Sequence, residues 1–102
     1  MSVNDHHRLD QRSLALHQAI AGALRRDPSL VQKAKGNLDR WEKTAPGPWI
    51  AEWRAVLDGP FDALLALLVA SDENAVRMRQ SSPFAGVLTE AERRAIYKSH
   101  AV

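Results

Sequence analysis

The stretch Pro60–Ala70, which reads PFDALLALLVA, decides the fold class of this chain. Its apolar residues fall on almost every side of a helix, and a helix that is apolar all round is buried by other elements. We therefore expect this helix at the centre of the core. No segment of the sequence alternates apolar and polar residues with the period of a strand, so the other elements are expected to be helices too.

Five further helices are predicted around the central one, each bounded by residues that start or stop helices. Asp27 is a candidate N-cap with Pro28 in the first turn, and Ser71 or Asp72 is placed to cap a later helix. Thr89 and Glu92 have the spacing of a capping box. The predicted ranges are about 9–26, 28–43, 49–58, 71–80 and 89–99.

The length of 102 residues fits one small domain and is too short for two independent cores. Residues 1–8 are polar and lack helical periodicity, which predicts a flexible N-terminal tail. Residues 9–99 are expected to form a single helical domain. The predicted fold is all-α, a compact bundle of five to six short helices with an apolar loop before the last helix.

Composition and charge exclude several classes of function. The sequence has no Cys, which excludes thiolate catalysis and Cys-ligated metal sites. Fourteen Lys and Arg residues against 12 Asp and Glu give a net charge of +2, too small to indicate a nucleic-acid binder by itself. No apolar run is long enough to span a bilayer, and the N-terminus lacks the pattern of a signal peptide. These features predict a cytoplasmic protein without a membrane partner.

Candidate catalytic and metal-binding residues are few. His6 and His7 are adjacent in the predicted tail, so they do not converge on one ion as helical ligands four residues apart would. Ser13 and His17 are four residues apart on one helix, but no glycine-rich loop or oxyanion-binding feature accompanies them. We therefore expect no enzyme activity, no cofactor, no metal and no small-molecule substrate.

Three tryptophans, Trp41, Trp49 and Trp53, flank a proline-rich turn. One interpretation is that they fill the gap between the second and third helices. The other is that they form part of a protein interface, where Trp is enriched among the residues that contribute most to binding. The sequence leaves both open.

The segment Arg79–Leu88 is the most unusual, because it places apolar side chains in a loop broken by proline and glycine. One interpretation is that Phe84 and Leu88 close the core and fix the last helix. The other is that the loop is an apolar tongue that enters a groove on another protein, with Phe84 as its anchor and Arg79 directed at an acidic site. The candidate partner-binding residues are Arg77, Arg79, Ser81, Ser82, Pro83, Phe84, Gly86, Val87 and Leu88.

The string SSPFAGVLT at Ser81–Thr89 also resembles the closing signature of a family of small bacterial helical proteins. The resemblance covers roughly residues 9–97, and the sequence departs from the family pattern at Arg94 and Tyr97. Shorter matches are Glu92-Arg93 with Ile96, Arg12-Ser13-Leu14, Asp27-Pro28, Asn37-Leu38, Arg40-Trp41, and Glu52-Trp53 with Leu57.

The resemblance implies an antitoxin-like or accessory small subunit. Members of this family are encoded beside larger proteins that resemble nucleotidyltransferases or nucleases, as in toxin–antitoxin modules. A protein partner of that kind, bound and inhibited by this chain, is therefore expected. The alternative is a DNA-binding regulator of the helix-turn-helix type, because small basic clusters lie at several predicted helix ends. Nucleic acid would then be a second partner.

Overall fold

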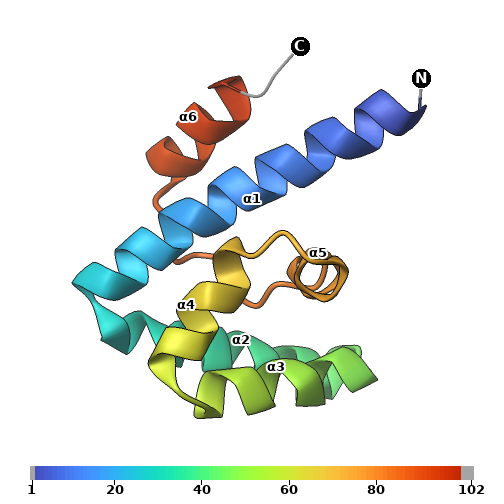
Figure 1. The fold of residues 1–102 in the computed structure, drawn as a ribbon. Coiled ribbons are helices and arrows are strands. Elements are labelled where there is room, and N and C mark those ends of the chain that lie inside the picture. The colour runs from blue at the N-terminus through green and yellow to red at the C-terminus, as the bar shows by residue number, and fades with distance from the viewer. Residues whose placement is uncertain (1, 100–102) are drawn as a thin grey trace.

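The computed structural model describes the backbone of residues 2–99 and the side chains of residues 10–99 (Figure 1). Helix α1, Ser2–Arg26, is as long as the molecule, since 25 residues rise about 37 Å and the longest dimension is 36 Å. It begins at Ser2 rather than at Leu9 or Asp10, so the predicted start was too late. The predicted flexibility of residues 1–8 stays a prediction.

Two antiparallel helices follow α1 and lie together on one side of it (Figure 1). The predicted second helix is split into a 3-10 turn η1, Pro28–Leu30, and helix α2, Val31–Thr44. The Asp27 side chain accepts a hydrogen bond from the Ser29 N–H, which confirms the predicted cap. Helix α3, Pro48–Asp58, begins at a proline. Proline is tolerated there because the first N–H groups of a helix have no partner within it, so the missing N–H costs no hydrogen bond.

Helix α4, Phe61–Val69, contacts both α1 and α3 and supplies three buried leucines, Leu64, Leu65 and Leu68. Its predicted central place in the core is confirmed. Burial is not complete all round, however, because Ala63 and Ala66 are exposed. The short alanine side chains leave one narrow face of the helix against solvent.

The last two helices begin at the predicted caps. Helix α5, Glu73–Arg79, is capped by Asp72, whose carboxylate accepts a hydrogen bond from the Ala75 N–H. Helix α6, Glu90–Ser99, starts at the predicted capping box: the Glu92 N–H donates to Thr89 Oγ1 at 3.1 Å, and the Thr89 N–H donates to the Glu92 carboxylate at 2.9 Å. Both caps are local in sequence, which is why the pattern predicted them.

Helix α6 lies on the side of α1 opposite to α2, α3 and α4 (Figure 1). It contributes no fully buried residue, and only Ile96 is partly buried. The predicted all-α fold is confirmed: residues 2–99 contain six α-helices, one 3-10 turn and no strand. Within this part of the chain, every helix is too short or too polar to cross a membrane.

The three tryptophans do not share one environment. The Trp41 and Trp49 rings contact each other between α2 and α3 with centroids 5.6 Å apart, and both are half-buried. Trp53 is fully buried in the core, where its ring and that of Phe84 pack edge to face with centroids 5.8 Å apart. Its indole N–H donates to the Met78 carbonyl. Trp53 is therefore a core residue.

Candidate functional site

The loop between α5 and α6 is held in place by side chains from the first two helices. Asn37 of α2 is buried, and its side-chain amide donates to the carbonyls of Pro83 at 2.8 Å and Ala85 at 3.0 Å. Lys33, one turn earlier, donates to the Gly86 carbonyl. These bonds satisfy the carbonyls of Pro83, Ala85 and Gly86, in a loop that lacks the regular backbone hydrogen bonds of a helix.

A buried histidine fastens the start of the loop to α1. His17 is 4% exposed, its Nδ1 lies 2.7 Å from the Ser13 carbonyl oxygen, and its Nε2 lies 2.8 Å from Ser82 Oγ. A carbonyl only accepts, so Nδ1 carries the proton and Nε2 accepts from the Ser82 hydroxyl. Ser13 and His17 are therefore hydrogen-bonded neighbours, but the bond uses the backbone carbonyl of Ser13. The hydroxyl that bonds to His17 belongs to Ser82.

The apolar residues of the loop point into the core. Pro83, Phe84 and Leu88 are 7% exposed or less. This agrees with the interpretation in which they close the core and disfavours the tongue interpretation, because Phe84 packs edge to face with Trp53 instead of projecting from the loop. Desolvation favours this arrangement, since a buried phenylalanine contributes about 1.5–3 kcal/mol relative to an exposed one. The partner-binding role of these residues stays a prediction.

Arg79 is also an internal residue. It is 6% exposed, and its Nη1 lies 2.7 Å from the Ala70 carbonyl and 3.3 Å from those of Leu67 and Leu68. Helix α4 has no basic residue in its own last turn, so Arg79 supplies the cation that its C-terminal carbonyls favour. This burial disfavours the predicted role of Arg79 as a charge directed at a partner, and that role stays a prediction.

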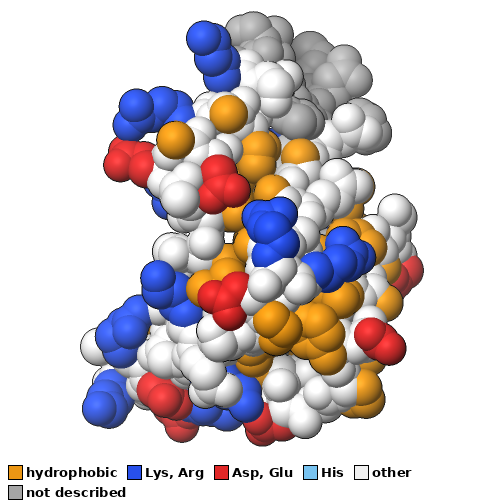
Figure 2. Space-filling view, turned by 90° about the vertical axis from the view of Figure 1, so that its left-hand side faces the viewer, with side chains coloured by type: hydrophobic (Ala, Val, Ile, Leu, Met, Phe, Trp, Pro, Cys, Tyr) orange, Lys and Arg blue, Asp and Glu red, His pale blue; other side chains and the backbone are white. Residues whose placement is uncertain are grey.

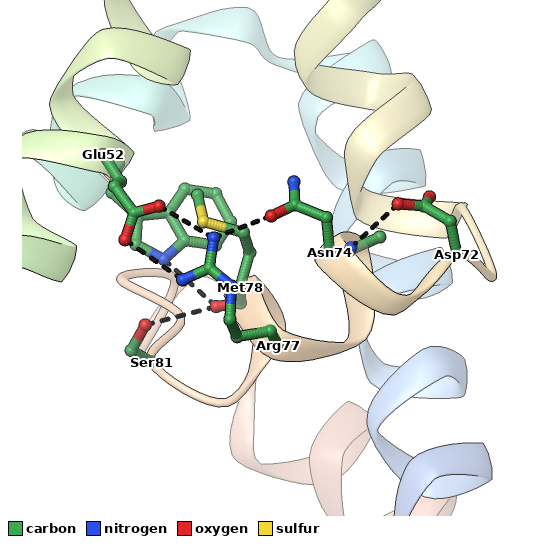
Figure 3. Close-up of polar contacts among 8 residues, drawn as sticks. Glu52, Asp72, Asn74, Arg77, Met78 and Ser81 are labelled. Carbon is green, nitrogen blue, oxygen red and sulfur yellow. Dashed lines mark hydrogen bonds and ion pairs between the residues drawn. The ribbon is translucent and has the colours of Figure 1, made fainter.

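Arg77 is exposed but already paired (Figure 3). Its guanidinium forms a two-point contact with the Glu52 carboxylate at 2.8 and 3.1 Å and a further hydrogen bond to Asn74. This hydrogen bonding is the main cause that holds the pKa of Glu52 below its usual value. The Ser81 hydroxyl, nearby, donates to the Met78 carbonyl. Arg77 therefore connects α5 to α3, and Ser81 bonds back to the last turn of α5.

The loop reaches the surface at Ala85–Val87, which we call the loop crest. Ala85 and Gly86 are exposed there, and Val87 is half-buried. Beside the crest lies a depression of about 220 Å³, open to solvent, between α1, the loop and α6. We call it the α1–α6 hollow. It is lined by Leu16, His17, Ile20, Ser82, Phe84, Ala85, Gly86, Leu88, Arg93 and Tyr97.

The border of the hollow is cationic. Arg93 lines it, Lys33 reaches the Gly86 carbonyl, and the Arg12 guanidinium lies 4.9 Å from the centre of the Tyr97 ring. In the described side chains none of these three cations forms an ion pair with a carboxylate, whereas the neighbouring Arg94 does, with Glu90. Figure 2 shows the surface indented below α6, with Lys and Arg side chains on both sides of the indentation.

Gly86 is the one described residue with a positive φ, +85°. An added Cβ would meet only the Lys33 side chain, at 3.9 Å, so substitution is limited by backbone conformation rather than by space. We expect Gly86→Ala to lower the free energy of unfolding by about 1–2 kcal/mol in urea denaturation. Gly22→Ala, inside α1 with ordinary contacts at 3.6 Å, is the control and is expected to stabilise by about 0.5–1 kcal/mol. Equal effects of the two would contradict this account.

His17 makes stability depend on pH. Burial, assisted by the charge of Arg79, lowers the pKa of His17 below 6.5 against the opposing effect of the Ser13 carbonyl. Below pH 6.5 the unfolded chain therefore binds a proton that the folded chain does not. The contribution of His17 to the free energy of unfolding is complete above that pH. It falls as the pH decreases toward the folded-state pKa, by up to about 1.4 kcal/mol per pH unit.

The measurement is urea denaturation at several pH values between about 5 and 8, bracketing the unfolded-state pKa, with His17→Gln as the comparison. Glutamine keeps an amide donor and a carbonyl acceptor but does not titrate. The slope below pH 6.5 is expected to be shallower in the variant. The same slope in both proteins would exclude His17 as its source.

Sequence reasoning placed the start of the last helix in the docking face but did not name Asn37, Arg93 or Tyr97 as site residues. Asn37 had a usable signal, since it is polar yet adjoins the apolar stripe that contains Ala34 and Leu38. Arg93 had a partial signal, since it belongs to a basic cluster at the start of the last helix. Tyr97 had none, because its position at the hollow depends on how α6 packs against α1.

No metal centre is built by the described side chains, among which no three His, Asp or Glu residues gather closely enough to hold an ion. His6 and His7 lie outside the described side chains. Comparison with known proteins finds no matching family model, no matching curated protein and no matching solved structure.

Proposed function

We propose that this chain is an antitoxin-like or accessory small subunit that binds and inhibits a partner protein encoded beside it, a toxin of the nucleotidyltransferase or nuclease type. The docking face would comprise the loop crest, Ala85–Val87, together with Arg93 and Tyr97 of α6. Inhibition would follow from this face covering the partner's active site.

One observation carries the proposal: an apolar hollow with a cationic border lies beside a loop that three side chains from α1 and α2 hold in one conformation. A fixed surface loses little entropy on binding, which favours affinity. Arginine and tyrosine are also the residue types that contribute most at protein interfaces. In this proposal the partner contacts the loop crest and α6, and the buried apolar residues of the loop hold these parts in place.

The alternative, a DNA-binding regulator, has less support. Lys35, Arg54 and Arg77, on α2, α3 and α5, are each paired with a carboxylate. Pairing of this kind neutralises the cations that would otherwise contact phosphates and release counterions. These three cations are therefore less available to phosphates than unpaired ones would be.

The test is co-expression of the tagged chain with the product of each adjacent gene, followed by size-exclusion chromatography and a growth assay. We expect one neighbour to slow growth when expressed alone, to lose that effect in the presence of this chain, and to co-elute with it in a stoichiometric complex. Elution of the chain alone with every neighbour would overturn the proposal. Recovery with bound DNA, weakened steeply by salt, would support the regulator instead.

A further inference from the structure

We propose that the α1–α6 hollow receives a bulky apolar side chain of the protein partner, and that carboxylates flanking this side chain bind Arg93, Lys33 and Arg12. The occupant is thus an acidic segment with one apolar residue at its centre. This inference rests on the proposed function, because it names the chemistry of the segment that such a partner would present.

The walls of the hollow select for an apolar group. Leu16 and Ile20 of α1 and Phe84 and Leu88 of the loop line it. Two of the polar residues in the lining, His17 and Ser82, are already hydrogen-bonded to each other. A polar group placed against His17 and Ser82 would find both already paired and would lose its bonds to water, which is costly. A volume of about 220 Å³ accommodates one large side chain.

The border selects for negative charge. Acidic residues in the neighbourhood are committed elsewhere: the Glu92 carboxylate accepts the Thr89 N–H, and Glu90 pairs with Arg94. Arg93 therefore has no carboxylate partner among the described side chains, and Lys33 bonds only to a backbone carbonyl. A guanidinium at the edge of an apolar site favours a carboxylate, with which it forms charge-assisted hydrogen bonds.

Tyr97 adds a stacking surface to the border. It is 40% exposed, and the Arg12 guanidinium lies over its ring. This contact fixes the positive charge of Arg12 next to the hollow at low conformational cost. An apolar centre surrounded by a charged rim is the ordinary anatomy of a protein interface.

The test is NMR titration of the full-length, isotopically labelled chain with three blocked peptides. The first probe is acetyl-Asp-Phe-Glu-amide. The second replaces its acids by Asn and Gln, and the third replaces its Phe by Ala. We expect the first to shift the amides of Gly86, Arg93 and Tyr97 with saturation in the millimolar range, and the other two to bind at least about tenfold more weakly.

Two variants of adjacent residues on α6 provide the matched control. Arg93→Glu is expected to weaken binding of the acidic peptide at least about tenfold, whereas Arg94→Glu is expected to leave it within about twofold, because Arg94 does not line the hollow. Both residues are exposed, so both variants are expected to fold. Absence of saturable shifts, shifts confined to another face, or equal binding of the neutral peptide would overturn the inference.

This outcome is separable from that of the proposed function. A stable complex with a neighbour-encoded protein, combined with no peptide binding at the hollow, would overturn the occupant assigned here and leave the partner-binding function supported. Peptide binding without any such complex would support the chemistry of the hollow and overturn the antitoxin-like role.

Discussion

Phe84→Ala is expected to lower the free energy of unfolding by about 3–5 kcal/mol, the usual cost of removing a fully buried ring. Phe84 is 3% exposed and meets Trp53 edge to face, so its loss leaves a cavity between the loop and the core helices. A domain of this size has a total stability of about 5–15 kcal/mol. The variant is therefore expected to be marginally stable at 37 °C.

Urea denaturation of Phe84→Ala beside Phe61→Ala measures this effect. Phe61, on α4, is only half-buried, so the same substitution is expected to cost clearly less there. Equal costs at the two positions, or a cost below about 1 kcal/mol at Phe84, would contradict its place in the core. Phe84→Leu preserves most of the volume and is expected to keep both the fold and partner binding.

Arg79→Met is expected to destabilise by about 2–4 kcal/mol. Methionine retains much of the apolar stem but removes the Nη1 donor, and the carbonyls of Leu67, Leu68 and Ala70 lose their partner in a water-poor environment. The end of α4 also loses the positive charge that opposes its dipole. We expect the loss to appear as a lower midpoint in thermal unfolding.

Arg94→Met is the control for the change in charge. Arg94 forms an exposed ion pair with Glu90 in which both side chains are 75% exposed, so its removal is expected to cost no more than about 0.5 kcal/mol. Similar midpoints for the two variants would show that the Arg79 hydrogen bonds contribute little. A defect of Arg79→Met in partner binding but not in stability would restore the interpretation of Arg79 as a contact residue.

The helices could be predicted from sequence because their boundaries depend on neighbouring residues. Asp72 and the Thr89–Glu92 box act over three residues, and the structure has both. The direction of the loop could not be predicted in this way. It depends on Asn37 and His17, whose partners lie 46 and 65 residues further along the chain.

The candidate site, too, was predictable only where it depends on local sequence. The sequence marked the segment before the last helix as unusual, but composition alone did not distinguish an apolar tongue from a core plug. Arg79 illustrates the reason: the same cation suits an acidic partner or the carbonyl end of α4, and only its burial decides. The hollow is formed by α1, the loop and α6 together, so no local pattern describes it.

Isothermal titration calorimetry tests the central claim most directly. The neighbour-encoded partner, purified free of this chain, is titrated with the wild-type chain, with Arg93→Glu and with Arg94→Glu. The account predicts tight binding by the wild type, a loss of at least about tenfold for Arg93→Glu, and little change for Arg94→Glu. Equal affinities of all three proteins would contradict the claim that this chain recognises its partner through the α1–α6 hollow.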